Sequence, residues 1–226
     1  MNKNYNSLEF LEAWSKLDTL NEAVGTAISS ATGVEFRLPF KTTKVTELVY
    51  HGSNADADDI KEFDFEYKYG QKVFAWFTPN FKGAEDYALD GGGGYVHSAF
   101  LNISNPLDLS HINLSENVFT FSGSEVRLSG ESSKLATVLK INPIEFFKHL
   151  KDLKAQIEKL DMLPIDIEEY YLFDYVKSPF FRADFEKYCS NNDGLICKDD
   201  QGISYAVCSN EQIYWLETIE VEDYFS

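Results

Sequence analysis

The sequence is poor in cysteine and has no long apolar segment. Three cysteines, Cys189, Cys197 and Cys208, are an odd number without metal-ligand spacing, so neither a disulfide framework nor a metal site is indicated. No run of about 18 apolar residues could span a bilayer, and the N-terminal "MNKNYNSLEFLEAW" lacks the apolar core of a signal peptide. We therefore expect a cytoplasmic protein without a membrane partner or a bound metal.

Basic residues are also scarce, because 20 Lys and Arg stand against 37 Asp and Glu and give a net charge of −17. This excess opposes attraction to a phosphate backbone and argues against a general nucleic-acid binder. It leaves open an enzyme that modifies nucleic acid at one specific place. It is compatible with a basic protein partner, and equally with an acidic surface that only keeps the protein soluble.

Aromatic residues, in contrast, are plentiful at 15% of the chain, and hydrophobic residues make up 44%. These amounts are typical of a folded protein, and the aromatic share favours β-structure. At 226 residues the chain is long enough for one sizeable domain with an appendage.

Short apolar runs separated by turn residues fill the segment from 46 to 109, and similar runs return after residue 190. Between them lies a predicted helical insertion over about 142–190. The pattern predicts an α+β fold with two packed, mostly antiparallel sheets. We divide the chain into a helical appendage over 1–44, with an amphipathic helix over 7–30, and a main domain over 45–226.

Local signals also predict individual helices. "FKGAEDYAL" is expected to form a short helix, while "LATVLKI" reads as a strand-like piece. A longer helix is expected to begin at Asn142 as N-cap with Pro143 in its first position. Two further helices are predicted over about 165–176 and from Ser178 onward. The longer helix is expected to bury Ile144, Phe147, Leu150, Leu153, Ile157 and Leu160.

Three motifs, taken in order, carry the functional prediction. "VYHGS" ends an apolar strand in His51 and Gly52. "WFTPNFKGAEDY" places Trp76 and Tyr87 eleven positions apart. "NDGLICKDDQGISYAVCSNEQI" forms a hairpin pattern near the C-terminus. Taken singly, each has an ordinary structural explanation: a strand histidine, two core aromatics and a turn.

Together these motifs resemble the ADP-ribosyltransferase superfamily, especially the branch shared by diphtheria toxin and the poly(ADP-ribose) polymerases. The resemblance covers about residues 47–109 and 192–216 and leans towards phage or bacterial effector proteins, which would act in the host cytoplasm if phage-encoded. It departs from the family at Trp76, where Tyr is usual. The resemblance implies that NAD is the substrate and that a protein is the acceptor.

The resemblance also implies roles for the matching residues. Trp76 and Tyr87 would clamp the nicotinamide ring, and Phe77 and Thr78 continue the same motif. Gly52 backbone atoms would hold the carboxamide, and His51 would bond a hydroxyl of the adenine-side ribose.

The catalytic acid is the point where the sequence departs most from the family, because Ser204 stands where a Glu is usual. In one interpretation Asp199 or Asp200 supplies the acid from the neighbouring turn. In a second, Glu211 or Gln212 takes this role. In a third, Ser204 marks a protein that binds NAD weakly or no longer turns it over.

We therefore predict a mono-ADP-ribosyltransferase with Asp199, Ser204 and His51 as catalytic candidates. Chain-building polymerase activity is not expected, because it usually needs the missing Glu. Gly202 stands where toxin-type enzymes that attack Arg often carry a second acid, which disfavours an Arg acceptor. The alternative is a catalytically degenerate scaffold that acts as an acidic protein-binding or inhibitor module.

Overall fold

The computed structural model describes residues 25–28, 35–54, 63–67, 71–90, 94–159, 169–199 and 202–221. Its elements, in chain order, are β1 Gly25–Ile28, β2 Glu35–Leu38, β3 Val49–Ser53, β4 Glu66–Tyr67, β5 Gln71–Lys72, β6 Ala75–Phe77, α2 Phe81–Leu89, β7 Gly94–Leu101, β8 Pro106–Asp108, β9 Phe119–Ser122, β10 Glu125–Leu128, α3 Gly130–Val138, α4 Pro143–Lys159, α5 Leu172–Lys177, α6 Pro179–Tyr188, β11 Gly194–Asp199, β12 Gly202–Val207, the 3₁₀ turn Asn210–Gln212 and β13 Ile213–Val221.

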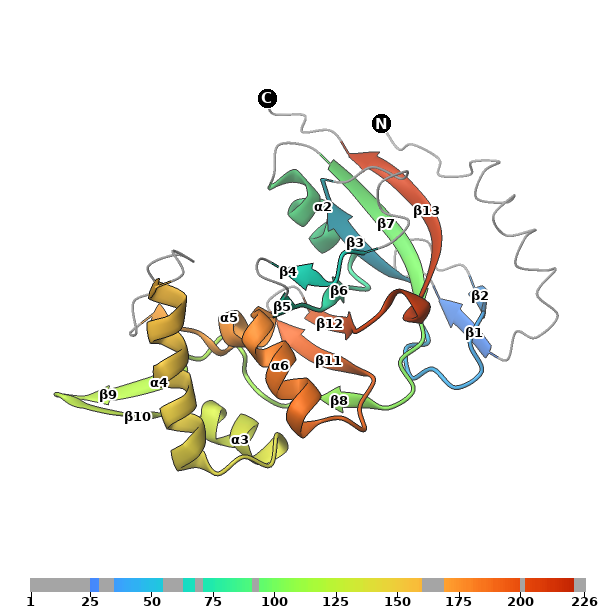
Figure 1. The fold of residues 1–226 in the computed structure, drawn as a ribbon. Coiled ribbons are helices and arrows are strands. Elements are labelled where there is room, and N and C mark those ends of the chain that lie inside the picture. Colours follow the sequence, from blue (N-terminus) through green and yellow to red (C-terminus); the bar gives the residue numbers. More distant parts are fainter. Residues whose placement is uncertain are drawn as a thin grey trace.

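Two sheets form the centre of the molecule (Figure 1). One has the strand order β6-β12-β11-β8, and the other has the order β13-β7-β3. All pairs in them are antiparallel except β11 with β8. The last strand, β13, leaves the β11–β12 hairpin and pairs with β7 in the other sheet. The predicted α+β class is confirmed.

The alternation of side chains along the strands builds the layers. On β12, Tyr205 and Val207 face a core between the sheets, whereas Ala206 faces the core beneath the helices. On β7, Ala99 contributes to the core between the sheets and Phe100 to a third core, which packs under α2. Because strand side chains point to opposite faces in turn, each sheet separates two cores.

The helical part between β10 and β11 covers the outer face of the four-stranded sheet (Figure 1). Asn142 Oδ1 accepts a hydrogen bond from the Ile144 amide at 2.9 Å, and Pro143 opens α4, as predicted. Leu150 and Leu153 are buried, also as predicted. The prediction that Ile144 is buried is wrong, because its side chain is 69% exposed and Phe146 fills the core instead. Ile157 and Leu160 lie outside the residues whose side chains are described.

The strand-like reading of residues 135–141 is also wrong, because α3 occupies most of this segment. Ser129 caps the helix: its side chain accepts a hydrogen bond from the Ser132 amide at 3.0 Å. Leu135 and Leu139 lie one turn apart and are both fully buried, so tertiary packing overrides the β-propensity of Thr137 and its neighbours. At α6, Ser178 is the N-cap and Pro179 the first residue, as predicted.

The predicted helix over 7–30 is contradicted at its end, where Gly25–Ile28 is strand β1 and pairs with β2. Gly25 disfavours a helix interior, and the β-branched Thr26 and Ile28 favour the extended backbone once a partner strand is present. Residues 7–24 lie outside the described residues. The boundary between an appendage over 1–44 and a domain over 45–226 stays a prediction.

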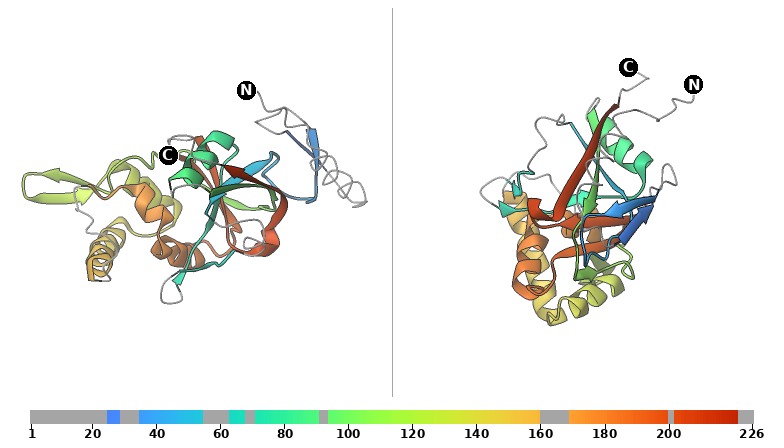
Figure 2. Two further views of the ribbon diagram at one scale, coloured as in Figure 1. Left: turned by 90° about the horizontal axis from the view of Figure 1, so that it is seen from above. Right: turned by 90° about the vertical axis from the view of Figure 1, so that its right-hand side faces the viewer.

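The β9–β10 hairpin projects beyond α4, away from the two sheets (Figures 1 and 2). Its base is joined to α4 by an edge-to-face contact of Phe119 with Phe147, whose ring centroids lie 5.7 Å apart. Among the described residues, no helix is both long and apolar enough to cross a membrane.

Helix α2 lies close against β3, and Gly52 is the residue that permits this contact. A Cβ atom at Gly52 would lie 2.0 Å from the Ala84 carbonyl oxygen and 2.9 Å from the Ala88 amide nitrogen. Both atoms belong to the backbone of α2, so a side chain at position 52 requires the helix to move. The position of α2, and of the residues that it carries, therefore depends on this glycine.

We predict that Gly52→Ala lowers the free energy of unfolding by about 1–3 kcal/mol, because the added methyl group overpacks a rigid contact. Urea unfolding followed by circular dichroism measures the change. Gly130→Ala is the matched control. Gly130 lies in the first turn of α3, and a Cβ there would meet nothing within 4 Å. Equal stability of the two variants would contradict the packing argument.

Candidate active site

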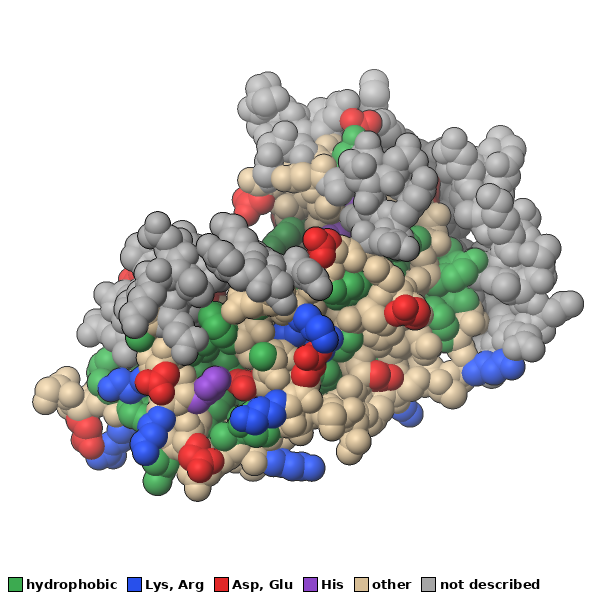
Figure 3. Space-filling view, viewed as in Figure 1, with side chains coloured by type: hydrophobic (Ala, Val, Ile, Leu, Met, Phe, Trp, Pro, Cys, Tyr) green, Lys and Arg blue, Asp and Glu red, His purple; other side chains and the backbone are tan. Residues whose placement is uncertain are grey.

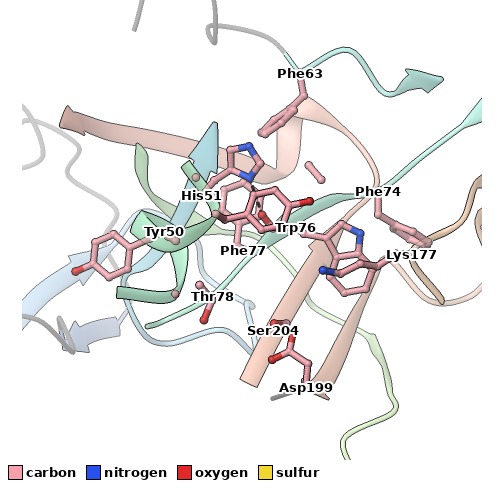
Figure 4. A pocket seen from close by; sticks show the side chains of 15 residues that line it. Tyr50, His51, Phe63, Phe74, Trp76, Phe77, Thr78, Lys177, Asp199 and Ser204 are labelled. Carbon is pink, nitrogen blue, oxygen red and sulfur yellow. Dashed lines mark hydrogen bonds between the residues drawn. The ribbon is translucent and has the colours of Figure 1, made fainter. Parts of the chain in front are cut away.

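A cavity of about 310 Å³ opens where β3, β6, β12 and α2 meet (Figure 4). Every residue that the sequence selected for the NAD site lines it: His51, Gly52, Trp76, Phe77, Thr78, Tyr87, Asp199 and Ser204. They come from separate parts of the chain, and the fold brings them together. Further lining residues include Tyr50, Phe63, Phe74 and Lys177, which the sequence analysis did not select.

The two sheets are joined beside this cavity by Tyr50 and Thr78. The Tyr50 amide donates to the Thr78 carbonyl at 2.8 Å, and the Thr78 amide donates to the Tyr50 carbonyl at 2.9 Å. The Thr78 hydroxyl also donates to the Ile203 carbonyl at 3.3 Å, which adds β12 to the joint. Thr78 therefore has a clear structural part in holding three strands around the cavity.

His51 is fixed by a hydrogen bond of 2.8 Å between its Nδ1 and the Trp76 carbonyl. A carbonyl oxygen only accepts, so Nδ1 carries the proton. Burial lowers the pKa of His51 to about 4, against the Trp76 hydrogen bond, which raises it, and with a smaller lowering from His97. The imidazole is therefore neutral near pH 7, and its Nε2 is left as an acceptor.

Aromatic rings hold the His51 imidazole in place. The ring of Phe63 meets it edge to face with centroids 4.6 Å apart, and the Phe77 ring lies 5.6 Å away. Phe77 itself is 2% exposed and belongs to the core between the sheets. The imidazole thus has an apolar surround with one polar anchor, which explains the direction of its pKa shift.

Trp76, Ser204 and Asp199 share one face of the four-stranded sheet. Trp76 pairs with Ala206 across β6 and β12, and Ser204 is two residues before Ala206. Ser204 pairs with Cys197, and Asp199 is two residues beyond Cys197. Because residues two apart on a strand point to the same side, all three side chains lie on the face that the helices cover.

Asp199 and Ser204 are joined directly. The Ser204 hydroxyl donates to Asp199 Oδ2 at 2.7 Å, and Ser204 is 7% exposed. A carboxylate therefore stands in the cavity although the usual Glu position is a serine. Asp200 lies outside the described residues.

Glu211 and Gln212, the second pair of acid candidates, do not line the cavity. Gln212 holds loops together: its Oε1 accepts from the Cys208 amide at 2.8 Å, and its Nε2 donates to the Asp193 carbonyl at 2.6 Å. The carboxylate of Glu211 has its pKa lowered by a hydrogen bond from Ser209. Of the sequence-derived acid candidates that the structure describes, Asp199 is the one in the cavity.

Trp76 and Tyr87 contact a cation. Tyr87 projects from α2 and is 66% exposed, and Trp76 is partly buried. The ammonium of Lys177 lies 5.7 Å from the centroid of the Trp76 ring and 5.6 Å from that of Tyr87. Lys177 ends α5, far from both aromatics in sequence, so no local motif indicates its place in the cavity.

Of the other histidines, His97 pairs with His51 across β3 and β7, with ring centroids 6.3 Å apart, but it does not line the cavity. His97, the strand histidine, is buried with its Nδ1 2.9 Å from the Thr218 hydroxyl. His149 Nε2 lies 2.8 Å from Asp184 in the helical part. Among the described residues, no group of three or more His, Cys, Asp or Glu side chains is arranged to hold a metal ion.

Two mostly antiparallel sheets, joined beside a cavity that is lined by His51 of β3 and by Trp76 and Tyr87 of β6 and α2, form an ADP-ribosyltransferase-like α+β fold. The chain belongs to the family described as ADP-ribosyltransferase in polyvalent proteins, whose model matches residues 46–215. The family predicted from the three motifs is thereby confirmed.

Other comparisons found less. No curated protein matches the sequence. Among solved structures, the crystal structure of the M. tuberculosis MbcT–MbcA toxin–antitoxin complex contains a similar chain. The two sequences are 7% identical, the match covers 96% of this chain and 93% of that chain, and the TM-score is 0.35.

The neutral state of His51 gives a test of the site's electrostatics. We predict that the His51 imidazole stays neutral down to about pH 5 and takes up its proton near pH 4. Histidine-selective NMR over this range measures it. His149 is the internal control, because its hydrogen bond to Asp184 raises its pKa above the usual value. A His51 transition near pH 6.5 would contradict the described environment.

The same shift predicts a direction for stability. Unfolded His51 takes up a proton near pH 6.5, whereas folded His51 does so only near pH 4. The contribution of His51 to the free energy of unfolding is therefore lost as the pH falls from about 6.5 to about 4. As the pH falls through this window, the free energy of unfolding should decrease more for wild type than for His51→Gln.

Proposed function

We propose that this protein cleaves NAD at the bond between nicotinamide and ribose and transfers one ADP-ribose unit to a protein side chain. One observation carries the proposal: eight residues that the sequence singled out through its resemblance to family motifs line one cavity. Membership of an ADP-ribosyltransferase family supports the same chemistry.

In the proposed complex the nicotinamide ring stacks between Trp76 and Tyr87. These residues offer flat aromatic faces from two different elements, β6 and α2. Stacking of this kind is worth about 1–3 kcal/mol per ring, by analogy with nucleobases. The energy serves to fix the ring while the bond to the ribose breaks.

His51 and Gly52 would hold other parts of NAD. With Nδ1–H bonded to Trp76, the His51 Nε2 is available to accept a hydrogen bond from a ribose hydroxyl. Gly52 lines the cavity without a side chain, so its backbone groups are open to the carboxamide. A neutral His51 is suited to this part, because it neither repels the cationic ring nor attracts the phosphates.

We propose that Asp199 takes the part of the missing Glu and acts as an ionised carboxylate. The bond between ribose carbon and nicotinamide nitrogen breaks, both electrons leave with the nicotinamide, and the ribose becomes an oxocarbenium-like cation. A carboxylate near this cation stabilises it electrostatically. Ser204 holds Asp199 by donating its hydroxyl proton, and its oxygen remains able to accept from a ribose hydroxyl. The acceptor then attacks the ribose carbon and releases its own proton to the surrounding water.

The alternative, a degenerate scaffold that binds a basic partner, is favoured by one feature, namely Ser204 at the usual Glu position. Figure 3 shows acidic and basic side chains interspersed over α4 and α6. The described residues on that face therefore form no single-sign patch of the kind that such a module would use. We favour the enzyme because the cavity holds a carboxylate.

The first test is labelling. Purified protein is incubated with NAD that is radiolabelled in its adenylate half, together with a bacterial lysate, and the products are separated on a denaturing gel. We expect a labelled protein band with wild type and none with His51→Ala, which loses the ribose contact and the bond to Trp76. Labelling by both proteins would contradict the site. Intact protein that yields neither a band nor free nicotinamide would favour the degenerate scaffold.

The second test separates the acid candidates. Asp199→Asn keeps the size of the side chain and removes its charge, so nicotinamide release should fall by about 10²–10³-fold. Glu211→Gln is the matched control and should keep full activity, because Glu211 does not line the cavity. An active Asp199→Asn variant beside an inactive Glu211→Gln variant would overturn the assignment. Unfolding temperatures establish that both variants are folded.

A further inference from the structure

A three-ring aromatic cage surrounds the Lys177 ammonium; two of its rings, Trp76 and Tyr87, line the cavity, and the third, Phe173, does not. The Lys177 Nζ lies 3.9 Å from the centroid of the Phe173 ring, in addition to its contacts with Trp76 and Tyr87. Figure 4 shows the Lys177 amino group against the indole of Trp76. A cation over an aromatic face is attracted by the negative charge of the π-system, and three faces add to this attraction.

The backbone of Lys177 is anchored on both sides, so a change in its position is a change of side-chain rotamer. Ser178 follows it and donates from both its amide, at 3.0 Å, and its hydroxyl, at 2.6 Å, to the Tyr175 carbonyl. Tyr175 before it and Pro179 after it are buried. The four methylene groups of the lysine, by contrast, allow the ammonium to leave the cage without movement of α5.

Nicotinamide in NAD competes with this ammonium for the same surfaces. The ring carries a positive charge as long as it is bonded to the ribose, and the proposed function stacks it on Trp76 and Tyr87. Two cations cannot share these faces, since like charges repel at short range. Ring binding therefore requires the ammonium to leave.

We propose that Lys177 is an internal competitor for the nicotinamide site and sets the affinity of the protein for NAD. The proposal rests on the proposed function, because it takes Trp76 and Tyr87 as the clamp for the ring. Lys177 fills the clamp when substrate is absent and is displaced when the cationic ring binds. Among the described residues that line the cavity, Lys177 is the one Lys or Arg, so the effect belongs to a single side chain.

The test uses Lys177→Met, which keeps an apolar stem of similar length and removes the charge. Ligand-observed NMR titration measures binding of 1-methylnicotinamide, which has the same cationic ring without ribose or phosphate. We expect the variant to bind this probe about 2- to 10-fold more tightly than wild type, the factor that corresponds to loss of a partly exposed cation–π competitor. The gain should be smaller for neutral nicotinamide, which must also displace the Lys177 ammonium but is not repelled by its charge.

Two control variants sharpen the result. Lys177→Arg keeps a cation and should bind the probe like wild type. Lys134→Met removes a surface lysine that pairs with Glu131 away from the cavity and should also have no effect. Unchanged or weaker probe binding by Lys177→Met would overturn the proposal, because it would mean that Lys177 does not compete or that it contacts the ligand favourably.

The same variants separate this proposal from the proposed function. If the protein turns over NAD, the KM for NAD should fall in Lys177→Met together with the probe's dissociation constant. If no variant turns over NAD but Lys177→Met binds the cationic ring more tightly, then Lys177 does compete for the ring site and the proposed transferase activity is wrong. A KM that rises in Lys177→Met would overturn the competitor, since it would show that the ammonium binds substrate, for instance at a phosphate.

Discussion

The paired backbone hydrogen bonds between Tyr50 and Thr78 are the joint on which the site depends. They connect the three-stranded sheet to the four-stranded sheet beside the cavity. His51 follows one member of the pair, and Trp76 and Phe77 precede the other, so the joint fixes the spacing between histidine and aromatic strand. The bond from His51 to the Trp76 carbonyl then sets the direction of the imidazole. The backbone hydrogen bonds therefore fix the position of His51, and its one hydrogen bond to Trp76 fixes the orientation of its ring.

A second constraint fixes the position of α2, which carries Tyr87 of the proposed clamp. Tyr87 belongs to α2, which packs on β3 through Ala84 and Ala88 only because Gly52 has no side chain. The glycine that the family motif places after the histidine therefore has a packing reason in this chain, separate from any contact with NAD. Because Tyr87 is carried by this helix, the separation of the aromatic rings is set by the helix–strand contact and not by the loop between them.

The sequence was informative wherever the signal was local. Asn142 and Pro143 marked the start of α4, because capping chemistry acts within a few residues, and the motif around His51 and Gly52 marked a strand, although it lies within β3 and not at its end. It failed where neighbours distant in sequence decide the outcome. Thr137 sits in a segment whose β-propensity was outweighed by burial of a helical face. Ile144 was assigned to the core by spacing, but its side chain is 69% exposed in the folded protein.

The cavity also contains residues that the sequence could predict and residues that it could not. Its eight expected residues were recognisable because their order along the chain follows a family pattern, which is information that periodicity does not contain. Lys177 could not be recognised, since its place depends on how the helical part folds back over the sheet. Phe173 escaped notice for the same reason, although one helical turn separates it from Lys177 and the pair is a short-range contact once α5 is known.

Charge balance connects the acid and the lysine. Among the described residues that line the cavity, Asp199 supplies one carboxylate and Lys177 one ammonium, while His51 is neutral. Burial raises the pKa of the Cys197 thiol, and the two charges act on it with smaller, opposite effects. In the proposed reaction a cationic ring replaces the ammonium, so the clamp keeps its positive charge and Asp199 keeps an opposite charge nearby. When the bond to the ribose breaks, the ring becomes neutral and the positive charge passes to the sugar. A carboxylate on β11, held by a serine on the neighbouring strand, can therefore serve where the family usually places a longer acid on β12, because the reaction requires a negative charge beside the sugar and not a particular side chain.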